Sequence, residues 1–520
     1  MLSAGADPLV ISRIPFGGRP IDFAARNGHR DVVNYLWSYA SPEDQAKGLS
    51  SSQTPLCIAA DCGHTRIVED LLTWNGWSED QKAEALIYAA AHWRFDAVTV
   101  LLRGNKFKPS IVKHALDAAM DEMAWGGPRP PTPEGFDYYN HQRLIELLFD
   151  TIKADTNEKS FNGFHLVRSA ASNANLTGAL KVLLEKGADT DRQDGVGYSA
   201  LHILASPVPV GRWSSGRLAM NETAIELLLQ HGASVTTPNK RGDSAIHLAA
   251  SGSDLRSFRL FLSPSSSRDE DENTLLALKN TNQETLLHYA AAGCRVDIME
   301  YLILRGLDVN AKNSNGWTPL MCALTPTSNS PLTYGKVNAI NTPAEATHAA
   351  LLLLSHGADP SITTDEGWTT LHALALHCDL DVRGKVAELA TQLIARGVDP
   401  AARAPLLTPR ATSDPKQLGM PWGHRLREAM MSPYARRMVM QPNLTPLHWS
   451  AQRGAVGVVK ALLAAGVDTV VTDSSGVSAV GMAHDSKALA MRAEAADAIV
   501  YVLLGAGAAS NIRPPGGYTR

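Results

Sequence analysis

The sequence predicts an all-α solenoid of stacked helix pairs joined by short β-hairpin fingers. Three observations predict this fold class. A helix start of the form Thr-x-Leu-x recurs along the chain, and its copies at Thr285 and Thr318 are 33 positions apart. An apolar segment with helical spacing follows the start, and a glycine ends that segment. A fixed period of about 33 residues is typical of stacked helix pairs rather than of one compact core.

Length and composition agree with such an array and exclude several classes of protein. A chain of 520 residues exceeds what one hydrophobic core normally serves, whereas an array grows by packing each unit on its neighbours. The net charge of −4 indicates no general attraction to nucleic acid or membranes. No apolar run approaches the ~18–20 residues that span a bilayer. Because five scattered cysteines are not a secreted disulfide framework, we expect a cytoplasmic or nuclear protein.

The units follow one another along the chain. Residues 2–8 resemble the end of a repeat whose beginning is missing, so we expect either a chain cut from a longer one or a worn first unit. Full repeats begin at Gly18 and Thr54, and two weaker ones lie around residues 86–102 and near Ala115. Later units begin at Val167, Ser199, Ser244, Thr285, Thr318, Thr369, Thr445 and Ser478. These starts give about a dozen repeats.

Each part of the unit has a local physical reason. Thr318 can cap a helix whose first residue is Pro319, where a missing N–H costs nothing. Paired alanines such as Ala59 and Ala60 favour a helix and let neighbouring helices approach closely. Gly63 breaks that helix, and the next helix carries apolar residues at helical spacing. Because one helix pair cannot bury both of its faces, only stacking makes it stable.

Together these residues resemble the ankyrin family. The resemblance rests on the start motif, the paired alanines, the Gly-His turn, the Leu-Leu segment and the Gly-Ala-Asp end, and it covers most of the chain. It implies an ankyrin solenoid with the inner helices on the concave side. It also implies protein–protein recognition without catalysis, cofactor or metal. We therefore expect a protein partner, no nucleic-acid or membrane partner, and a monomeric chain.

The resemblance also places candidate contact residues. The family's binding face comprises the hairpin tips and the two variable residues between the alanine pair and the Gly-His turn. The residues of this chain at such places are Arg26, Asn27, Asp61, Gln452, Arg453, Lys240, Arg241, Asp365 and Glu366. Both signs of charge occur among them, so they specify neither an acidic nor a basic partner. Trp317 and Trp368 each precede a start threonine, and we expect them to pack within the hairpins.

Insertions interrupt the regular spacing. Three of them, residues 125–140, 207–220 and 326–343, fall between the two helices of a unit and carry aromatic residues. The largest, 404–442, falls between repeats on the hairpin side, with six basic residues against two acidic ones and five of the 13 methionines. We interpret it as a solvated loop, as a docking segment for an acidic groove, or as a short basic targeting signal. Its candidate contact residues are Arg425, Arg427, Arg436 and Arg437.

The repeats and insertions suggest a division of the chain into four parts. Residues 1–157 are partly degenerate N-terminal repeats, and 158–403 are central repeats with insertions. Residues 404–442 are the basic, methionine-rich insertion, as a loop or a disordered segment, and 443–520 are C-terminal repeats with a tail. We expect the degenerate repeats around residues 83–119 and the large insertion to be the least stable parts of the array.

The sequence offers no catalytic site. The longest segment outside the repeats, 404–442, has 39 residues, and a segment below ~40 residues rarely folds without disulfides or metal. His372, His377 and Cys378 do not form a metal cluster, because helical rotation points the latter two away from the first. Residues 505–510 are glycine-rich but follow a helix, whereas phosphate-binding loops follow a strand. The resemblance gives the histidine after each start leucine a structural role, tying neighbouring hairpins by hydrogen bonds. These histidines are His202, His247, His288, His372 and His448.

Two other interpretations stay open. In the first, the chain is the sensor or adaptor part of a larger signalling protein, which agrees with the truncated repeat at residues 2–8. In the second, the solenoid binds or transforms a small molecule in a pocket walled by the aromatic insertions. A longer transcript decides the first interpretation, and a buried pocket with convergent polar groups decides the second.

Overall fold

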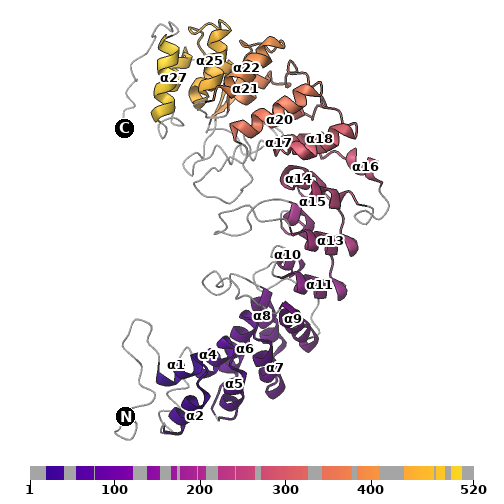
Figure 1. The fold of residues 1–520 in the computed structure, drawn as a ribbon, viewed down its shortest axis with the longest axis vertical. Coiled ribbons are helices and arrows are strands. Elements are labelled where there is room, and N and C mark those ends of the chain that lie inside the picture. The colour runs from indigo at the N-terminus through magenta and orange to yellow at the C-terminus, as the bar shows by residue number, and fades with distance from the viewer. Residues whose placement is uncertain are drawn as a thin grey trace. The chain divides into compact units, whose positions relative to one another are not determined.

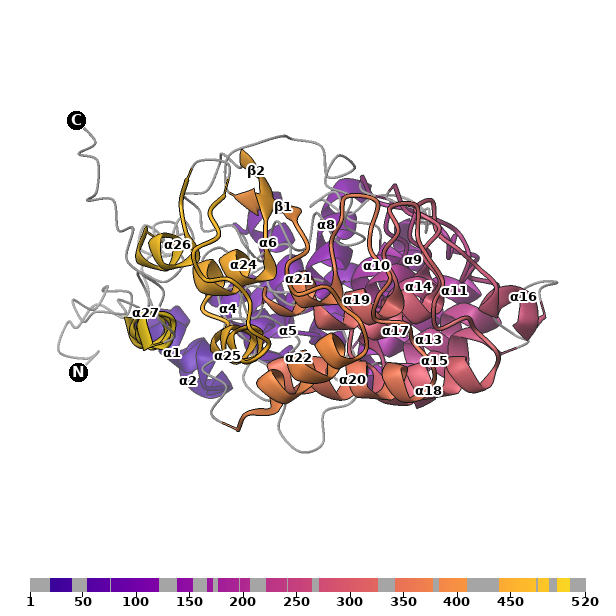
Figure 2. The ribbon, with the colours of Figure 1, turned by 90° about the horizontal axis from the view of Figure 1, so that it is seen from above.

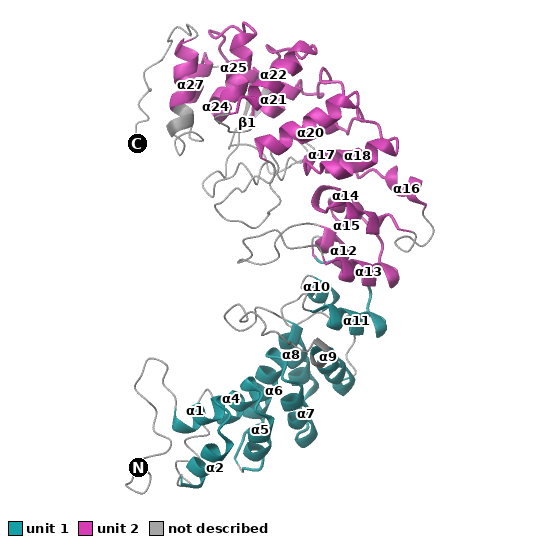
Figure 3. Cartoon of the chain, viewed as in Figure 1, with its two compact units in different colours: residues 1–194 teal, residues 195–520 magenta. Residues whose placement is uncertain are grey.

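The structure, a computed structural model, describes most of the repeats. The described residues are 19–39, 54–74, 76–120, 138–152, 166–171, 176–195, 197–205, 221–240, 242–263, 271–325, 342–376, 383–408, 439–473, 476–485 and 493–505. The chain forms two compact units, residues 1–194 and residues 195–520 (Figure 3). Within its described residues, each unit is a stack of helix pairs, with an inner and an outer helix in each pair (Figure 1).

The first unit contains five helix pairs in its described part. Each inner helix packs on the next inner helix, and each outer helix packs on the next outer one. The inner helices are α1 (Pro20–Arg26), α4 (Pro55–Cys62), α6 (Glu79–Ala91), α8 (Pro109–Met120) and α10 (Leu166–Ala171). The outer helices are α2 (Arg30–Tyr39), α5 (Thr65–Leu72), α7 (Phe95–Gly104), α9 (Tyr138–Ile152) and α11 (Thr177–Glu185).

The second unit contains seven such pairs in its described part, stacked in the same way. Its inner helices are α12 (Ala200–Ala205), α14 (Ala245–Gly252), α17 (Leu286–Ala292), α19 (Pro319–Leu324), α21 (Thr370–Leu374), α24 (Pro446–Arg453) and α26 (Ala479–Asp485). Its outer helices are α13 (Glu222–Gln230), α15 (Leu255–Phe261), α18 (Val296–Leu304), α20 (Pro343–Ser355), α22 (Lys385–Ala395), α25 (Val456–Ala464) and α27 (Ala493–Gly505). A short extra helix, α16 (Glu272–Leu276), follows α15. The predicted all-α solenoid of about a dozen helix pairs is confirmed.

The insertions largely lie outside the described residues, with one exception. Strands β1 (Ala404–Thr408) and β2 (Val439–Leu444) form a two-stranded antiparallel sheet at the two ends of the large insertion. Ala404 pairs with Leu444 and Thr408 with Val439, with an irregularity after Ala404. Figure 2 shows the strands beside α24, on the side away from outer helix α25. Neither strand was expected from the sequence. Of the aromatic residues in the insertions at 125–140, 207–220 and 326–343, Trp125, Trp213 and Tyr334 lie outside the described part of the chain, whereas Tyr138 and Tyr139 begin helix α9.

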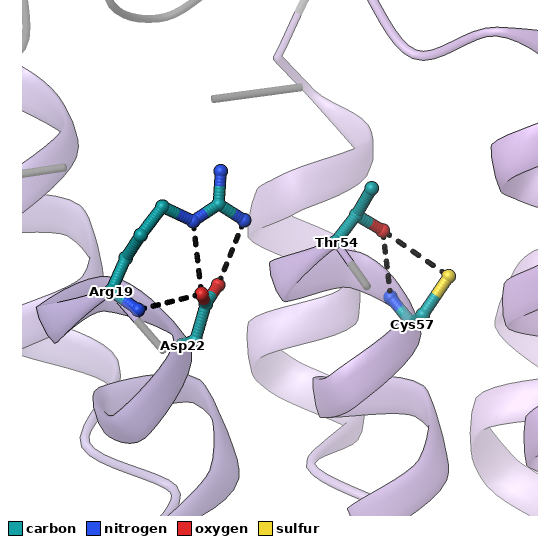
Figure 4. Close-up of polar contacts among 4 residues, drawn as sticks. All are labelled: Arg19, Asp22, Thr54 and Cys57. Atoms are coloured by element: carbon teal, nitrogen blue, oxygen red, sulfur yellow. Dashed lines mark hydrogen bonds and ion pairs between the residues drawn. The ribbon is translucent and has the colours of Figure 1, made fainter. Parts of the chain in front are cut away.

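Polar caps fix the start of several inner helices. Before α4, the Thr54 hydroxyl accepts a hydrogen bond from the backbone N–H of Cys57 (3.2 Å) (Figure 4). Before α1 the cap residue is Arg19, which has no hydroxyl. The Asp22 carboxylate replaces that cap by accepting from the Arg19 backbone N–H (2.9 Å) and from its guanidinium Nε (2.9 Å). The first repeat therefore keeps the helix start with a buried ion pair.

Histidines join the helix caps of the second unit to the next finger. Nδ1 of His288 accepts the backbone N–H of Thr285 (3.1 Å), so this nitrogen carries no proton. Nε2 then carries the proton and donates it to the carbonyl of Trp317 in the next repeat (3.1 Å). His202 and His372 make the same pair of contacts, with the carbonyls of Asp243 and Leu444. The predicted role of these three histidines is confirmed.

Two histidines keep only half of this arrangement. His247 and His448 each share a hydrogen bond with the hydroxyl of their cap residue, Ser244 (2.7 Å) or Thr445 (2.8 Å). Among the described residues, neither Nε2 has a hydrogen-bond partner of normal geometry. The cap contact is thus the constant part of the motif, and these two rings face the carbonyls of Glu284 and Val477 in the next finger without standard hydrogen-bond geometry.

An aspartate closes each of five repeat ends. The side-chain oxygen of this aspartate accepts the backbone N–H two residues further on, at 2.8 to 3.0 Å. Such a turn reverses the chain after the outer helix and leads it into the finger. The five aspartates are Asp189, Asp308, Asp359, Asp399 and Asp468.

Acidic pH should destabilise the second unit through its buried histidines. Burial lowers the pKa of His247, His288 and His372 to about 4, from an ordinary 6.5. The unfolded chain therefore binds protons between these values while the folded chain does not, and stability falls as pH drops through this window. We expect the urea midpoint to decline below pH ~6.5 and this contribution to level off near 4. Replacing His288 and His372 by Asn should reduce the slope of that decline, and an unchanged slope would contradict the prediction.

A close backbone contact makes a second prediction. Gly293 ends α17, and a Cβ atom there would lie 2.2 Å from the carbonyl oxygen of Ser251 in the preceding repeat. We expect Gly293→Ala to destabilise the second unit by about 1–3 kcal/mol, because the two repeats must separate. Gly104→Ala is the control, since nothing lies within 4 Å of the Cβ it would add. Equal urea midpoints for the two variants would contradict the prediction.

Candidate partner-binding surface

The fingers of the second unit share one turn geometry. In five fingers the backbone N–H of the first turn residue donates to the carbonyl four residues later, at 2.8 to 3.1 Å. The first residues of these turns are Asn239, Asn280, Asn313, Thr364 and Asp473. The side-chain oxygen of each accepts the N–H of that same fifth residue, at 2.8 to 3.1 Å. Isolated β-bridges such as Lys279 with Thr285 complete the predicted short hairpins.

Neighbouring fingertips are tied to one another. The backbone N–H of Ser314 donates to the carbonyl of Asn282 in the preceding finger (2.8 Å). The backbone N–H of Asp365 donates to the carbonyl of Asn315 (3.3 Å). These bonds hold consecutive tips in a fixed register, so their exposed side chains form a defined surface.

A buried polar network supports two of the fingers. The two N–H groups of the Asn280 amide are shared among Glu284 (2.6 Å), the Tyr289 hydroxyl (3.0 Å) and Asp243 (3.2 Å). The Tyr289 hydroxyl in turn donates to Asp243. Asp243 and Glu284 are both buried. Hydrogen bonds of this kind offset the cost of burying the two carboxylates and couple one finger to the next.

Tryptophans pack inside the next fingers. The ring centroids of Trp317 and Trp368 lie 5.3 Å apart. Those of Trp368 and Trp449 lie 4.1 Å apart, with the two rings nearly perpendicular (85°). All three side chains are buried. The prediction that Trp317 and Trp368 pack within the hairpins is confirmed. Edge-to-face aromatic contacts add to the stability of their stacking beyond the area they bury.

The predicted tip residues differ in their exposure and in whether their side chains already make hydrogen bonds within the fold. Asp365 is exposed. Lys240 is also exposed, but its ammonium donates to the carbonyl of Gly195 (2.6 Å) and so ties its tip to the preceding finger. Glu366 is half-buried, and burial, followed by the charge of Asp365, raises its pKa. Arg241 lies outside the described residues, as do Arg425, Arg427, Arg436 and Arg437 of the insertion.

The predicted turn residues of the first unit make hydrogen bonds or ion pairs that stabilise the fold. Arg26 is exposed, and its carbonyl accepts a hydrogen bond from Nε2 of His64 in the next repeat (2.9 Å). The Asn27 side chain donates to the carbonyl of Phe23 and so closes α1 (2.8 Å). Asp61 lies at ion-pair distance from Nδ1 of His92 (2.5 Å), at the end of the next inner helix. Sequence spacing gave no signal for His92, because it contacts Asp61 only once the repeats stack.

The corresponding residues of the second unit end helix α24. Gln452 and Arg453 are both half-buried there. In other repeats, an arginine makes a further hydrogen bond at the same turn, which the sequence spacing did not indicate. Arg295 donates from Nε to the carbonyl of Ser251 (3.2 Å), as Arg94 of the first unit donates to the carbonyl of Asp61 (2.9 Å). The next repeat thus holds the backbone at Asp61 and Ser251, and Asp61 keeps part of its side chain exposed whereas Ser251 is buried.

The described residues contain little reactive chemistry. No group of three or more His, Cys, Asp or Glu side chains that could hold a metal ion occurs among them. Burial raises the pKa of the Cys57 thiol to about 11 and that of Cys294 to about 12, so both are protonated at neutral pH. Within this part of the chain, no helix is long and apolar enough to cross a membrane. Cys62, at a turn of the first unit, is a half-buried free thiol whose pKa is also raised by burial.

Comparison with known families agrees with this architecture. The family model described as ankyrin repeats (3 copies) matches residues 21–111, 216–311 and 270–329. The model described as ankyrin repeat matches residues 443–474. The matched ranges fall in both units and include the first helix pairs, the fingers with the polar network, and the repeat that follows β2.

Several curated proteins are similar over part of this chain. The palmitoyltransferase AKR1 of Lachancea kluyveri is 26% identical over 250 residues, which cover 46% of this chain and 29% of the relative. The nuclear factor NF-kappa-B p105 subunit of Gallus gallus is 28% identical, over 34% of this chain and 15% of the relative. A homolog of transient receptor potential cation channel subfamily A member 1 from Caenorhabditis elegans is 33% identical, over 24% and 9%. The chain thus spans less than a third of the length of each of these relatives.

The shared turn geometry predicts a stabilising substitution in one finger. Gln283 has φ +61°, at the turn position that Gly242, Gly316 and Gly367 occupy in other fingers. A side chain is strained in this left-handed region, so we expect Gln283→Gly to stabilise the second unit by about 1 kcal/mol. Gln392→Gly, inside helix α22, should instead destabilise by about 1 kcal/mol. Urea unfolding measures the free energy of unfolding of both variants, and hydrogen exchange in α17 locates the gain expected for Gln283→Gly. A loss of stability in Gln283→Gly would contradict the prediction.

Proposed function

The chain belongs to the ankyrin-repeat family, and on this basis we propose that it is a non-catalytic scaffold or adaptor that binds a partner protein. The contact surface is formed by the fingertips and by the turns at the ends of the inner helices. The observation that carries the proposal is the hydrogen-bonded register of consecutive tips, from Asn282 through Ser314 to Asp365. Because the tips are fixed before a partner arrives, binding loses little conformational entropy.

The relatives support recognition rather than one activity. Their names describe a palmitoyltransferase, a nuclear factor subunit and a cation channel, and each is matched over less than a third of its length. Because these three names differ, they do not indicate one shared activity for this chain. What the matches have in common is similarity to a chain of stacked repeats. We propose that the chain acts inside the cell and that catalysis is not part of its role.

The large insertion is the proposed source of specificity. Between β1 and β2 the sequence carries Arg425, Arg427, Arg436 and Arg437. The paired strands give this insertion a fixed base beside α24. A basic segment on such a base suits an acidic groove of a partner, because electrostatic attraction speeds encounter and selects the partner by charge.

Partner capture tests the proposal. Affinity purification with mass spectrometry should recover a specific partner with the intact chain. A variant that joins Thr408 to Val439 through Asn-Gly keeps the strand pair and removes the basic segment, and it should lose that partner. The double variant Lys240→Glu, Asp365→Lys should weaken binding while keeping net charge unchanged. Its matched control, Lys460→Glu with Glu226→Lys on outer helices, should bind normally.

The outcomes separate the parts of the proposal. If the strand-joined variant keeps every partner while the tip variant loses them, specificity lies in the fingers and not in the insertion. If the outer-helix control loses partners and the tip variant does not, recognition by the fingers is wrong. If no protein is captured by the intact chain, the scaffold proposal itself fails.

A further inference from the structure

Four asparagines of the sequence precede a glycine: Asn27, Asn75, Asn162 and Asn315. The asparagine side chain is chemically labile at such a step, because glycine has no Cβ to keep the following backbone nitrogen away from the side-chain Cγ. Asn75 and Asn162 lie outside the described residues. Asn27 ends helix α1, whereas Asn315 lies at a fingertip, so the two steps stand in different surroundings.

The Asn27 side chain is held by the fold. Its amide donates to the carbonyl of Phe23 (2.8 Å), so the side chain is not free to rotate toward the nitrogen of Gly28. The backbone N–H of Gly28 donates to the carbonyl of Ala25 (3.4 Å). A reaction between Asn27 and Gly28 must therefore break a side-chain and a backbone hydrogen bond.

The Asn315 side chain has no such restraint. Among the described residues, no group makes a hydrogen bond to its amide, and the residue is only half-buried, so water reaches it. The neighbouring backbone is fixed by Asn313. Its side chain accepts the N–H of Asn315 (3.0 Å), and its carbonyl accepts the N–H of Gly316 (3.1 Å). Of these two bonds, the second must break before the nitrogen of Gly316 reacts.

We propose that Asn315 is a site of spontaneous deamidation, with aspartate and isoaspartate as the products. The backbone nitrogen of Gly316 attacks Cγ of Asn315. The side-chain amide group leaves with the proton of that nitrogen as ammonia, and a cyclic imide remains. Water then opens the ring. Hydrolysis at Cγ gives aspartate, and hydrolysis at the former backbone carbonyl gives isoaspartate, whose main chain runs through Cβ and Cγ. Water is the only co-reactant, and nothing is oxidised or reduced.

Both products change the contact between neighbouring fingertips. The carbonyl of Asn315 accepts the backbone N–H of Asp365 (3.3 Å), and in isoaspartate this carbonyl becomes a carboxylate outside the main chain. The longer main chain has little room, because a Cβ on Gly316 would already lie 3.0 Å from the nitrogen of Asp365. The Asp365 carboxylate lies 3.1 Å from the same Cβ position, so the charge that either product adds next to Gly316 is repelled.

The modification goes beyond partner binding, because it occurs whether or not the fingertips contact a partner. Peptide mapping of the folded full chain during incubation at mildly alkaline pH measures it, and electron-transfer fragmentation distinguishes isoaspartate from aspartate. Because Asn27 must also lose a side-chain hydrogen bond, we expect Asn315 to convert about 5-fold faster than Asn27. Asn315→Gln should stop conversion at this position, because glutamine forms the larger ring slowly. Asn27→Gln is the matched control and should leave the rate at Asn315 unchanged.

Hydrogen exchange then measures the effect on the fingertips. The amide of Asp365 should exchange at least ~5-fold faster in the chain that carries isoaspartate, because its acceptor is displaced. Asn315→Asp adds the charge without lengthening the main chain, and it should give a smaller increase. Unchanged exchange in outer helix α18 verifies that the repeats remain folded.

Two results would overturn the proposal. The first is conversion at Asn315 that is no faster than at Asn27, because the backbone hydrogen bond of Gly316 would then protect the fingertip. The second is a chain that carries isoaspartate at this position and exchanges the amide of Asp365 as slowly as before. Neither result depends on capture of a partner, so each is distinct from a failure of the scaffold proposal.

Discussion

Within each unit, the described helices depend on the neighbouring helix pairs against which they pack. Inner helices such as α10 and α12 have only six residues, and isolated helices below ~12–15 residues are marginal in water. Stability therefore comes from stacking, and stacking works only if successive repeats keep one register. Polar contacts set that register: neutral histidines join a cap to the next finger, and turn residues such as Arg94 bind the carbonyl of the previous turn. The apolar core fills the space that these contacts define.

The same register links the fold to recognition. Hydrogen bonds between neighbouring fingertips hold their side chains at a spacing that the repeat sets. A partner therefore contacts one continuous surface rather than a set of independent loops. The network around Asn280 and the tryptophans around Trp368 lie directly behind such tips. Substitutions in this buried layer should therefore alter the surface without touching a partner. The cost of a change at a tip depends on whether its side chain, like that of Lys240, already ties two fingers together.

Much of the fold could be predicted because its signals are local and repeated. Thr54, Pro55 and the alanine pair that follows specify a helix start without knowledge of any distant residue. The histidine ties could be predicted from the family resemblance. Strands β1 and β2 were missed because neither has strong alternation, and their pairing joins residues on both sides of a long insertion. The worn repeats around residues 83–119 nonetheless form α6, α7 and α8, with buried alanines in place of the start motif.

The candidate contact residues were harder to predict, because exposure is decided by the neighbouring repeat. Asp61 looks like a variable surface position in the sequence, yet stacking brings it to His92, and Asn27 turns back to cap its own helix. Hydrogen exchange of the chain with and without its captured partner tests recognition by the fingertips. On binding, exchange should slow at the fingertips around Ser314 and Asp365 and stay unchanged in outer helices α18, α20 and α22. Protection confined to those outer helices would contradict it.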